Sequence, residues 1–119
     1  MNNLNDLKIW NKAVDLSIEI YNLTNEFPEI EKFGLINQMR RASVSIASNI
    51  AEGAGRNSKK EFKHFLAISH GSSYELLTQL QISFKLKFCK EDVFIELKTK
   101  IIEIQKMNFA LQQKLITKD

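Results

Sequence analysis

The chain has 119 residues, 44% hydrophobic and 26% charged, which suits one folded domain with a real core and a charged surface. Its formal net charge of +3 permits association with nucleic acid but does not require it. A single cysteine excludes an intramolecular disulfide, and no apolar run approaches the roughly 20 residues of a membrane span. The N-terminal MNNLNDLKIW lacks the pattern of a signal peptide, so we expect a cytoplasmic protein without membrane contact.

The first predicted helix covers residues 6–25, with Asn5 or Asp6 as its N-terminal cap. Pro28 ends it, because proline disfavours the helical conformation in the residue before it. Apolar residues recur at helical spacing and form an arc wider than the roughly 100° that a surface helix needs. One side of this arc is set apart as a candidate subunit contact: Trp10, Val14, Ile18 and Tyr21.

The second predicted helix covers residues 35–54 and is rich in small residues, which let a neighbouring helix approach closely. Gly53 or Gly55 is expected to supply a left-handed residue that closes it. The third predicted helix covers residues 58–87. Ser58 and Glu61 have the spacing of a capping box, in which each side chain accepts from a free backbone N–H group.

Folding these two helices back on each other about Arg56 predicts their contacts. In that register, Ile46 meets Leu66, Ser43 meets Ser69 and Met39 meets Ser73. Large residues then face each other near the corner and small residues meet midway, as expected of an antiparallel helical hairpin.

The fourth predicted helix begins near Glu91 or Asp92 and carries two apolar rows. The first row is a near-heptad seam, with Asn108 at one of its positions. The second row repeats every seven residues and contains Ile95, Ile102, Phe109 and Ile116. A monomeric bundle needs only the first row. We interpret the second row as a subunit contact, partnered by the arc of the first helix; the alternative is a wide bundle that buries both rows.

Four helices with short connections predict an all-α fold, an antiparallel up-down-up-down four-helix bundle in a single domain over residues 1–119. One proline and four glycines leave little room for long irregular loops, and strand-like alternation is not sustained anywhere.

Candidate catalytic and metal-binding residues are few. Glu61 and His64 have the Glu-x-x-His spacing of di-iron bundles, but the only other histidine, His70, has Ala67 in the position of the glutamate. Lys87 and Lys90 near Cys89 would favour a thiolate, yet a partly buried, idle cysteine is the better interpretation. We therefore expect no enzyme activity, no catalytic residue, no metal site and no cofactor.

A basic cluster is the strongest functional signal. Residues 40–63 contain six basic side chains against two acidic ones, a local excess of +4. Phosphates are attracted to such a cluster, especially near the N-terminus of a helix. Arg40 could instead pair with a carboxylate across a subunit contact, and a solvated helix end is the alternative for the rest. The candidate nucleic-acid contacts are Arg40, Arg41, Arg56, Lys59, Lys60 and Lys63.

The segment FGLINQMRRASVSIASNIAEGAGRNSKKEFKHFLAISHGSSYELLTQL, residues 33–80, resembles the four-helix bundle proteins encoded in intervening sequences of bacterial 23S ribosomal RNA genes. Arg40-Arg41-Ala42, the run SNIAEG and the run SKKEF carry the resemblance. Ala47 departs from it, since many members have proline there, and this departure predicts a straighter helix. These proteins are in turn similar to the accessory variability proteins of diversity-generating retroelements, which are pentameric, basic and work with nucleic acid.

The resemblance implies a homo-oligomer, with a homopentamer as the expected assembly, that is ribosome-associated and RNA-binding, and it carries over no catalytic residue. Our leading hypothesis is a non-enzymatic oligomeric bundle that binds structured RNA or DNA through phosphate contacts. The alternative is a protein-interaction scaffold or adaptor whose basic corner receives an acidic protein partner.

Overall fold

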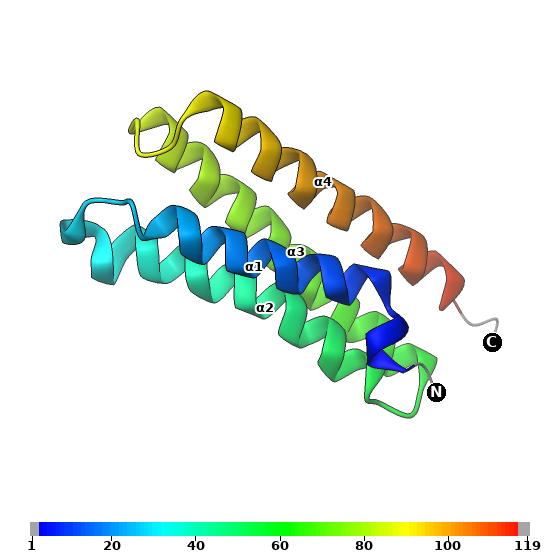
Figure 1. The fold of residues 1–119 in the computed structure, drawn as a ribbon. Helices are drawn as coiled ribbons and strands as arrows, with labels where there is room; N and C mark the ends of the chain where they lie inside the picture. The colour runs from blue at the N-terminus through cyan, green and yellow to red at the C-terminus, as the bar shows by residue number, and fades with distance from the viewer. Residues whose placement is uncertain (1–2, 117–119) are drawn as a thin grey trace.

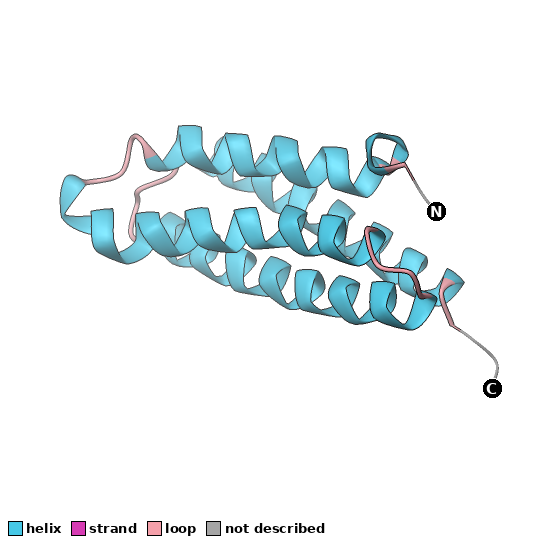
Figure 2. Cartoon of the chain, turned by 90° about the horizontal axis from the view of Figure 1, so that it is seen from below, coloured by secondary structure: helices cyan, strands magenta, loops and turns pink. Residues whose placement is uncertain are grey.

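The computed structural model describes residues 3–116, which contain four long helices and no strand (Figure 2). The helices are α1 (Lys8–Thr24), α2 (Asn37–Ala54), α3 (Lys59–Lys85) and α4 (Glu91–Lys114). Each predicted helix is therefore present, with bounds that differ by a few residues from the sequence-based ones.

The helices form an antiparallel up-down-up-down bundle, 50 × 23 × 23 Å in extent (Figure 1). Around the bundle, α1 packs on α2 and α4, and α3 packs on α2 and α4. The start of α1, the α2–α3 corner and the end of α4 lie at one end of the bundle, and the other two connections lie at the opposite end (Figure 1). The predicted fold class is confirmed.

The core is formed by one apolar stripe from each helix. Fully buried members include Leu16, Ile20, Met39, Ile46, Ile50, Leu66, Leu76, Leu80, Ile101 and Ile104. Asn108 lies in the α4 seam at 1% exposure, and its Nδ2 donates to the carbonyl of Leu66, 2.9 Å away. Because this amide is satisfied by the backbone of α3, a polar residue is tolerated at a core position.

The start of α1 differs from the prediction. A short 3₁₀ turn, Leu4–Asp6, precedes α1, and Asn3 rather than Asn5 or Asp6 provides a side-chain cap, by accepting from the backbone N–H of Asn5. Leu7 stands at the N-terminal cap of α1 and makes no side-chain hydrogen bond. The extended backbone of Leu7 separates the two turns, so the predicted helix begins two residues too early.

The connection from α1 to α2 contains more helical structure than expected. A 3₁₀ turn, Glu29–Glu31, leads into a π-helical turn, Lys32–Ile36, and α2 follows at Asn37. Gly34 interrupts the turn with non-helical φ and ψ angles of −109° and −110°. The carboxylate of Glu31 accepts a 3.4 Å hydrogen bond from the backbone N–H of Leu35, which helps to hold the turn.

The α2–α3 corner combines one confirmed and two revised features. Ser58 caps α3 as predicted, accepting a 3.1 Å hydrogen bond from the backbone N–H of Glu61. The Glu61 carboxylate accepts from the Ser58 hydroxyl, not from a backbone N–H group. The prediction of a left-handed glycine is wrong: Gly55 has φ −79° and ψ −8°, because the chain leaves α2 through a right-handed turn. Gly53 lies inside α2 and permits a close approach of α3.

The antiparallel α2–α3 hairpin is present as predicted, but its predicted register is wrong. Ser69 lies opposite Ile46 and not Ser43, since its hydroxyl donates to the carbonyl of Ile46, 2.8 Å away, and Ser43 pairs with Ser17 of α1 at 3.0 Å. It is Ser45 that faces α3, where it meets Ser72 at 2.9 Å, because Ser43 and Ser45 lie about 200° apart around the helix.

Further from the corner, Met39 accepts from Ser83, not from Ser73. Residues of α3 therefore meet α2 later in the sequence than a fold about Arg56 predicts.

Candidate nucleic-acid interface

Three lysines form the uncompensated part of the basic cluster. Lys59, Lys60 and Lys63 lie on the first two turns of α3, and none makes an ion pair within residues 3–116. Lys59 and Lys60 are exposed and Lys63 is half-buried. The free N–H groups at the start of a helix add positive potential at the same place. We call these three residues the lysine corner.

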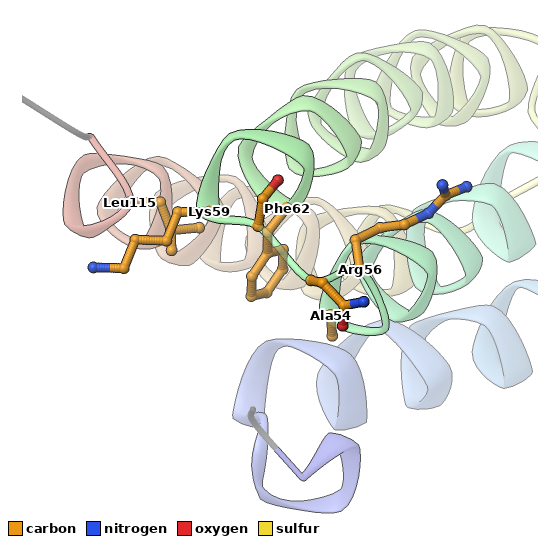
Figure 3. Close-up of a pocket in the computed structure, with 7 residues that line it drawn as sticks. Ala54, Arg56, Lys59, Phe62 and Leu115 are labelled. Carbon is orange, nitrogen blue, oxygen red and sulfur yellow. The ribbon is translucent and has the colours of Figure 1, made fainter. Parts of the chain in front are cut away.

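Arg56 lies beside the lysine corner but is engaged within the chain. Its guanidinium pairs with Glu52 at 3.4 Å and with Glu61 at 3.7 Å, and it stacks over the ring of Phe65, 4.9 Å from the ring centre. Figure 3 shows Arg56 and Lys59 projecting in opposite directions from the corner. The charge of Arg56 is thus partly compensated before any ligand approaches.

A cavity of about 380 Å³ opens at the corner, between the start of α3 and the end of α4 (Figure 3). Ser58 and Lys59 supply polar groups to its wall, whereas Ala54, Phe62 and Leu115 supply apolar surface. A ligand here would meet both a positive rim and a hydrophobic floor.

Arg40 and Arg41 lie elsewhere. Arg41 is exposed on α2, about 21 Å along the helix from Gly55 at 1.5 Å per residue. Arg40 turns toward α1, where it donates to Thr24 and Asn25 at 2.9 Å each and lies over the ring of Tyr21 at 4.6 Å. The six predicted contacts therefore divide into a corner group of four, an arginine held between two helices and a separate exposed arginine.

The second apolar row of α4 is at the surface. Ile95, Phe109 and Ile116 are 53%, 61% and 52% exposed, and Ile102 is half-buried; of these four, Ile116 lies just past the end of α4. The alternative of a wide bundle that buries both rows is wrong, since the first row alone fills the core. On α1, Ile18 and Tyr21 are exposed as well, while Trp10 and Val14 are partly buried against the core.

Ion pairs fix the sides on which these two rows lie. Lys12 of α1 pairs with Glu103 of α4 at 2.6 Å, and Lys100 of α4 pairs with Glu19 of α1 at 2.5 Å. The ion-paired residues mark the side on which each of the two helices faces the other. Because successive helical residues are 100° apart, the α1 row projects away from α4 and the α4 row projects away from α1. The two apolar rows flank the bundle on opposite sides of this charged seam.

A polar groove of about 550 Å³ lies between α2 and α3, toward the end of the bundle opposite the corner. Its lining is Phe33, Asn37, Gln38, Arg41, Glu75 and Gln79. Sequence reasoning singled out only Arg41 among these residues. The one available signal was Phe33, an aromatic residue beside a glycine in a charged connector.

Cys89 is buried, and Glu61 is engaged by neighbouring side chains. Cys89 is 8% exposed, and burial, followed by the negative charge of Asp92, raises the pKa of its thiol. Glu61 is occupied by the cap of α3 and by Arg56. Over the described part of the chain, no group of three or more histidine, cysteine and acidic side chains is placed to hold a metal ion. No helix between residues 3 and 116 has the length and apolar content required to cross a membrane.

Comparison with known proteins places this bundle in a family. The model of the 23S rRNA-intervening sequence proteins matches residues 5–110, which is most of the chain and includes both the lysine corner and the groove. The chain belongs to this family. No curated protein matches the sequence.

A solved structure supports the fold of this intervening-sequence protein. The chain is similar to the crystal structure of a protein of unknown function from the S23 ribosomal protein family of Bacteroides thetaiotaomicron VPI-5482, with a TM-score of 0.80. The two share 19% sequence identity over 88% of this chain and 98% of the other. At this identity, the likeness concerns the arrangement of the four helices.

Proposed function

We propose that this protein is a non-enzymatic, oligomeric helical bundle that binds nucleic acid, structured RNA such as ribosomal RNA in particular, through a basic surface. The lysine corner carries the proposal. Lys59, Lys60 and Lys63 stand without ion pairs among the described residues, at the N-terminus of a 27-residue helix whose dipole adds positive potential. Arg56 contributes less in this proposal, because two carboxylates already hold it.

Membership of the 23S rRNA-intervening sequence protein family supports RNA over DNA as the ligand and the cytoplasm and ribosome as the setting. The relation to the accessory proteins of diversity-generating retroelements is part of the same proposal. Arg41 joins the lysine corner as a more distant contact. Arg40 is assigned to the fold, since Thr24 and Asn25 already accept from its guanidinium.

Self-association completes the proposed architecture. Two apolar rows on opposite sides of one bundle suit a head-to-tail contact, in which the α1 row of one copy packs on the α4 row of the next. Such heterologous contacts generate a closed ring where the rotation between neighbouring copies closes, and a homopentamer is the proposed ring. A ring would repeat the lysine corner around one rim and thereby increase the number of phosphates that one assembly can contact.

The experiment is a salt titration of RNA binding by fluorescence anisotropy. Between about 50 and about 200 mM salt, three phosphate contacts lower the affinity by roughly tenfold or more. The double variant Lys59→Glu, Lys60→Glu should weaken binding and flatten this salt dependence. The matched control, Lys85→Glu with Lys106→Glu, has the same net charge but leaves the corner intact. Equal affinity at both salt concentrations, or equal loss in both double variants, contradicts the proposal.

The second candidate function is a scaffold or adaptor for an acidic protein. The apolar wall of the corner cavity, formed by Ala54, Phe62 and Leu115, favours it because a phosphate backbone makes no use of that surface. Pull-down with and without nuclease separates the two functions. A partner that survives nuclease treatment supports the adaptor, and one that is lost supports nucleic acid.

A further inference from the structure

The groove between α2 and α3 contains an aromatic side chain that folding does not explain. Phe33 is 87% exposed, and the ammonium of Lys32 lies over its ring, 5.6 Å from the ring centre. Leaving a phenylalanine in water forgoes the stabilisation that burial would give. The π-helical turn that begins one residue earlier, and the break at Gly34, place this ring at the mouth of the groove.

The wall of the same groove holds an unsatisfied polar group. Gln79 is 7% exposed, and its Oε1 is buried without a hydrogen-bond partner among the described residues. Buried amides are normally paired, and Gln79 lines the groove, so a ligand bound there could supply the missing partner. Rotation of the amide about its last bond would turn either its oxygen or its nitrogen toward a ligand there.

The remaining side chains supply donors and acceptors at one place. Arg41 carries only donors, Glu75 carries only acceptors, and Asn37 and Gln38 carry both. Arg41 and Glu75 make no ion pair with each other or with another residue within the described range. Both charges are therefore available to a ligand.

From this arrangement we infer that the groove binds an unpaired guanine of RNA, an inference that rests on the proposed function. An exposed aromatic ring offers a stacking surface for a base, as aromatic residues do in proteins that bind single-stranded nucleic acid. Guanine presents two N–H donors side by side on its Watson–Crick edge, N1–H and N2–H, and a carboxylate such as Glu75 accepts both. Arg41 and the amide groups donate to O6 or N7, or to the neighbouring phosphate.

The location of the groove is compatible with one RNA touching both sites. Arg41 lies about 21 Å along α2 from the corner, which is within the span of a short hairpin. The lysine corner would hold the phosphates of the stem, whichever its sequence, while the groove would select a base in the loop. This division of contacts between the lysine corner and the groove gives the protein a preference for RNA loops that the lysines alone cannot provide.

The test uses four labelled RNA hairpins that share one stem and differ in a single central base of a uridine-rich loop, together with the fully paired duplex of the stem. Affinity is measured by anisotropy at one fixed salt concentration. The wild-type protein should bind the guanine hairpin about fivefold more tightly than the adenine, cytosine or uridine hairpin, and all hairpins more tightly than the duplex.

Variants assign the two contributions. Phe33→Ala should remove the advantage of hairpins over the duplex, and Glu75→Gln should remove the advantage of the guanine hairpin over the other three. Ile30→Ala is the matched control, since Ile30 is 89% exposed on the same connector but does not line the groove. Because Phe33 and Ile30 are at the surface, both variants should unfold at the temperature of the wild type.

The outcomes distinguish this inference from the proposed function. If all hairpins and the duplex bind equally and binding still depends on salt and on Lys59 and Lys60, the groove inference is overturned and the proposed function stands. If no RNA binds, both fail. If Phe33→Ala leaves RNA binding intact and instead abolishes capture of a nuclease-resistant protein partner, the groove belongs to a protein and the inference is overturned.

Discussion

Arg40 of α2 closes the C-terminal end of α1 through Thr24. The Nε atom of Arg40 donates to the Thr24 hydroxyl at 2.9 Å, and that hydroxyl in turn donates to the carbonyl of Ile20, 2.8 Å away within α1. The guanidinium also reaches the carbonyl of Tyr21 and the side chain of Asn25. The last carbonyls of a helix carry partial negative charge, so a cation supplied by the neighbouring helix stabilises this end.

The first prediction concerns this contact. Arg40→Ala should lower the free energy of unfolding by about 1–3 kcal/mol, because it leaves the buried Thr24 hydroxyl and the helix end without their donors. Urea unfolding followed by circular dichroism measures the change. Arg41→Ala, the neighbouring variant, should leave stability unchanged, since Arg41 is exposed and makes no ion pair among the described residues. An equal effect of the two variants contradicts the assignment of Arg40 to the fold.

The second prediction concerns the close approach of α2 and α3 at Gly53. A Cβ atom at this position would lie 2.9 Å from both Phe62 Cδ1 and Phe65 Cβ. Real Cβ atoms do not come so close, so Gly53→Ala must push the two helices apart, and it should destabilise the protein by about 1–3 kcal/mol.

Gly71→Ala is the control for this prediction. Gly71 lies in α3 with nothing within 4 Å of its would-be Cβ, so the alanine adds helix propensity without a clash. It should stabilise the protein by about 0.5–1 kcal/mol. Thermal unfolding of the two variants measures these opposite changes in stability. A Gly53→Ala protein as stable as the wild type would contradict the close approach of α2 and α3 at Gly53.

The helices and their buried stripes could be predicted from the sequence because helical periodicity is a local property. The seam of α4 around Ile101 and Ile104 and the Ser58 cap of α3 follow from residues within one or two turns of each other. The exposed row around Phe109 could also be recognised, since a second apolar row exceeds what one bundle can bury.

The partners of individual side chains could not be predicted, because they depend on how two helices face each other. Ser43 and Ser45 look equivalent in sequence, but one faces α1 and the other α3. The sequence predicts Arg40 and Arg56 as candidate nucleic-acid contacts, but the folded chain surrounds both with acceptors. The groove beside Phe33 joins residues from two helices and a turn, so no local motif marks it.

The third prediction concerns the Cys89 thiol. Burial raises its pKa, and the charge of Asp92 adds to the effect, so the thiol is neutral in the native protein at neutral pH. A group whose pKa is raised by folding contributes stability below its unfolded pKa and loses that contribution as the pH rises through the folded value. Stability should therefore fall slightly at alkaline pH.

The measurement combines thiol labelling with unfolding. Native Cys89 should react with a disulfide reagent at neutral pH far more slowly than in urea, because the thiolate is the nucleophile and the sulfur is covered. Cys89→Ser is the control for the pH dependence. Because a serine hydroxyl does not ionise in this range, the stability of this variant should not show the decline at alkaline pH. Rapid labelling of the folded protein at neutral pH contradicts the prediction.

The fourth prediction concerns the two apolar rows. If the α1 row of one copy packs on the α4 row of the next, Ile18→Glu and Phe109→Glu should each abolish assembly, since each damages one of the two complementary surfaces. Both residues are exposed in the single bundle, so neither variant should unfold it. Ile30→Glu is the control, because Ile30 is equally apolar and exposed but belongs to neither row. Light scattering gives the mass of each variant.

Mixing the two assembly-deficient variants tests the head-to-tail geometry itself. The Ile18→Glu protein retains an intact α4 row and the Phe109→Glu protein retains an intact α1 row, so together they can form one intact contact. The mixture should contain a heterodimer and nothing larger, because the remaining surfaces of the pair are both damaged. If each row instead packed on its own counterpart, each variant alone would still dimerise through its undamaged row. A monomeric wild type contradicts self-association through these rows altogether.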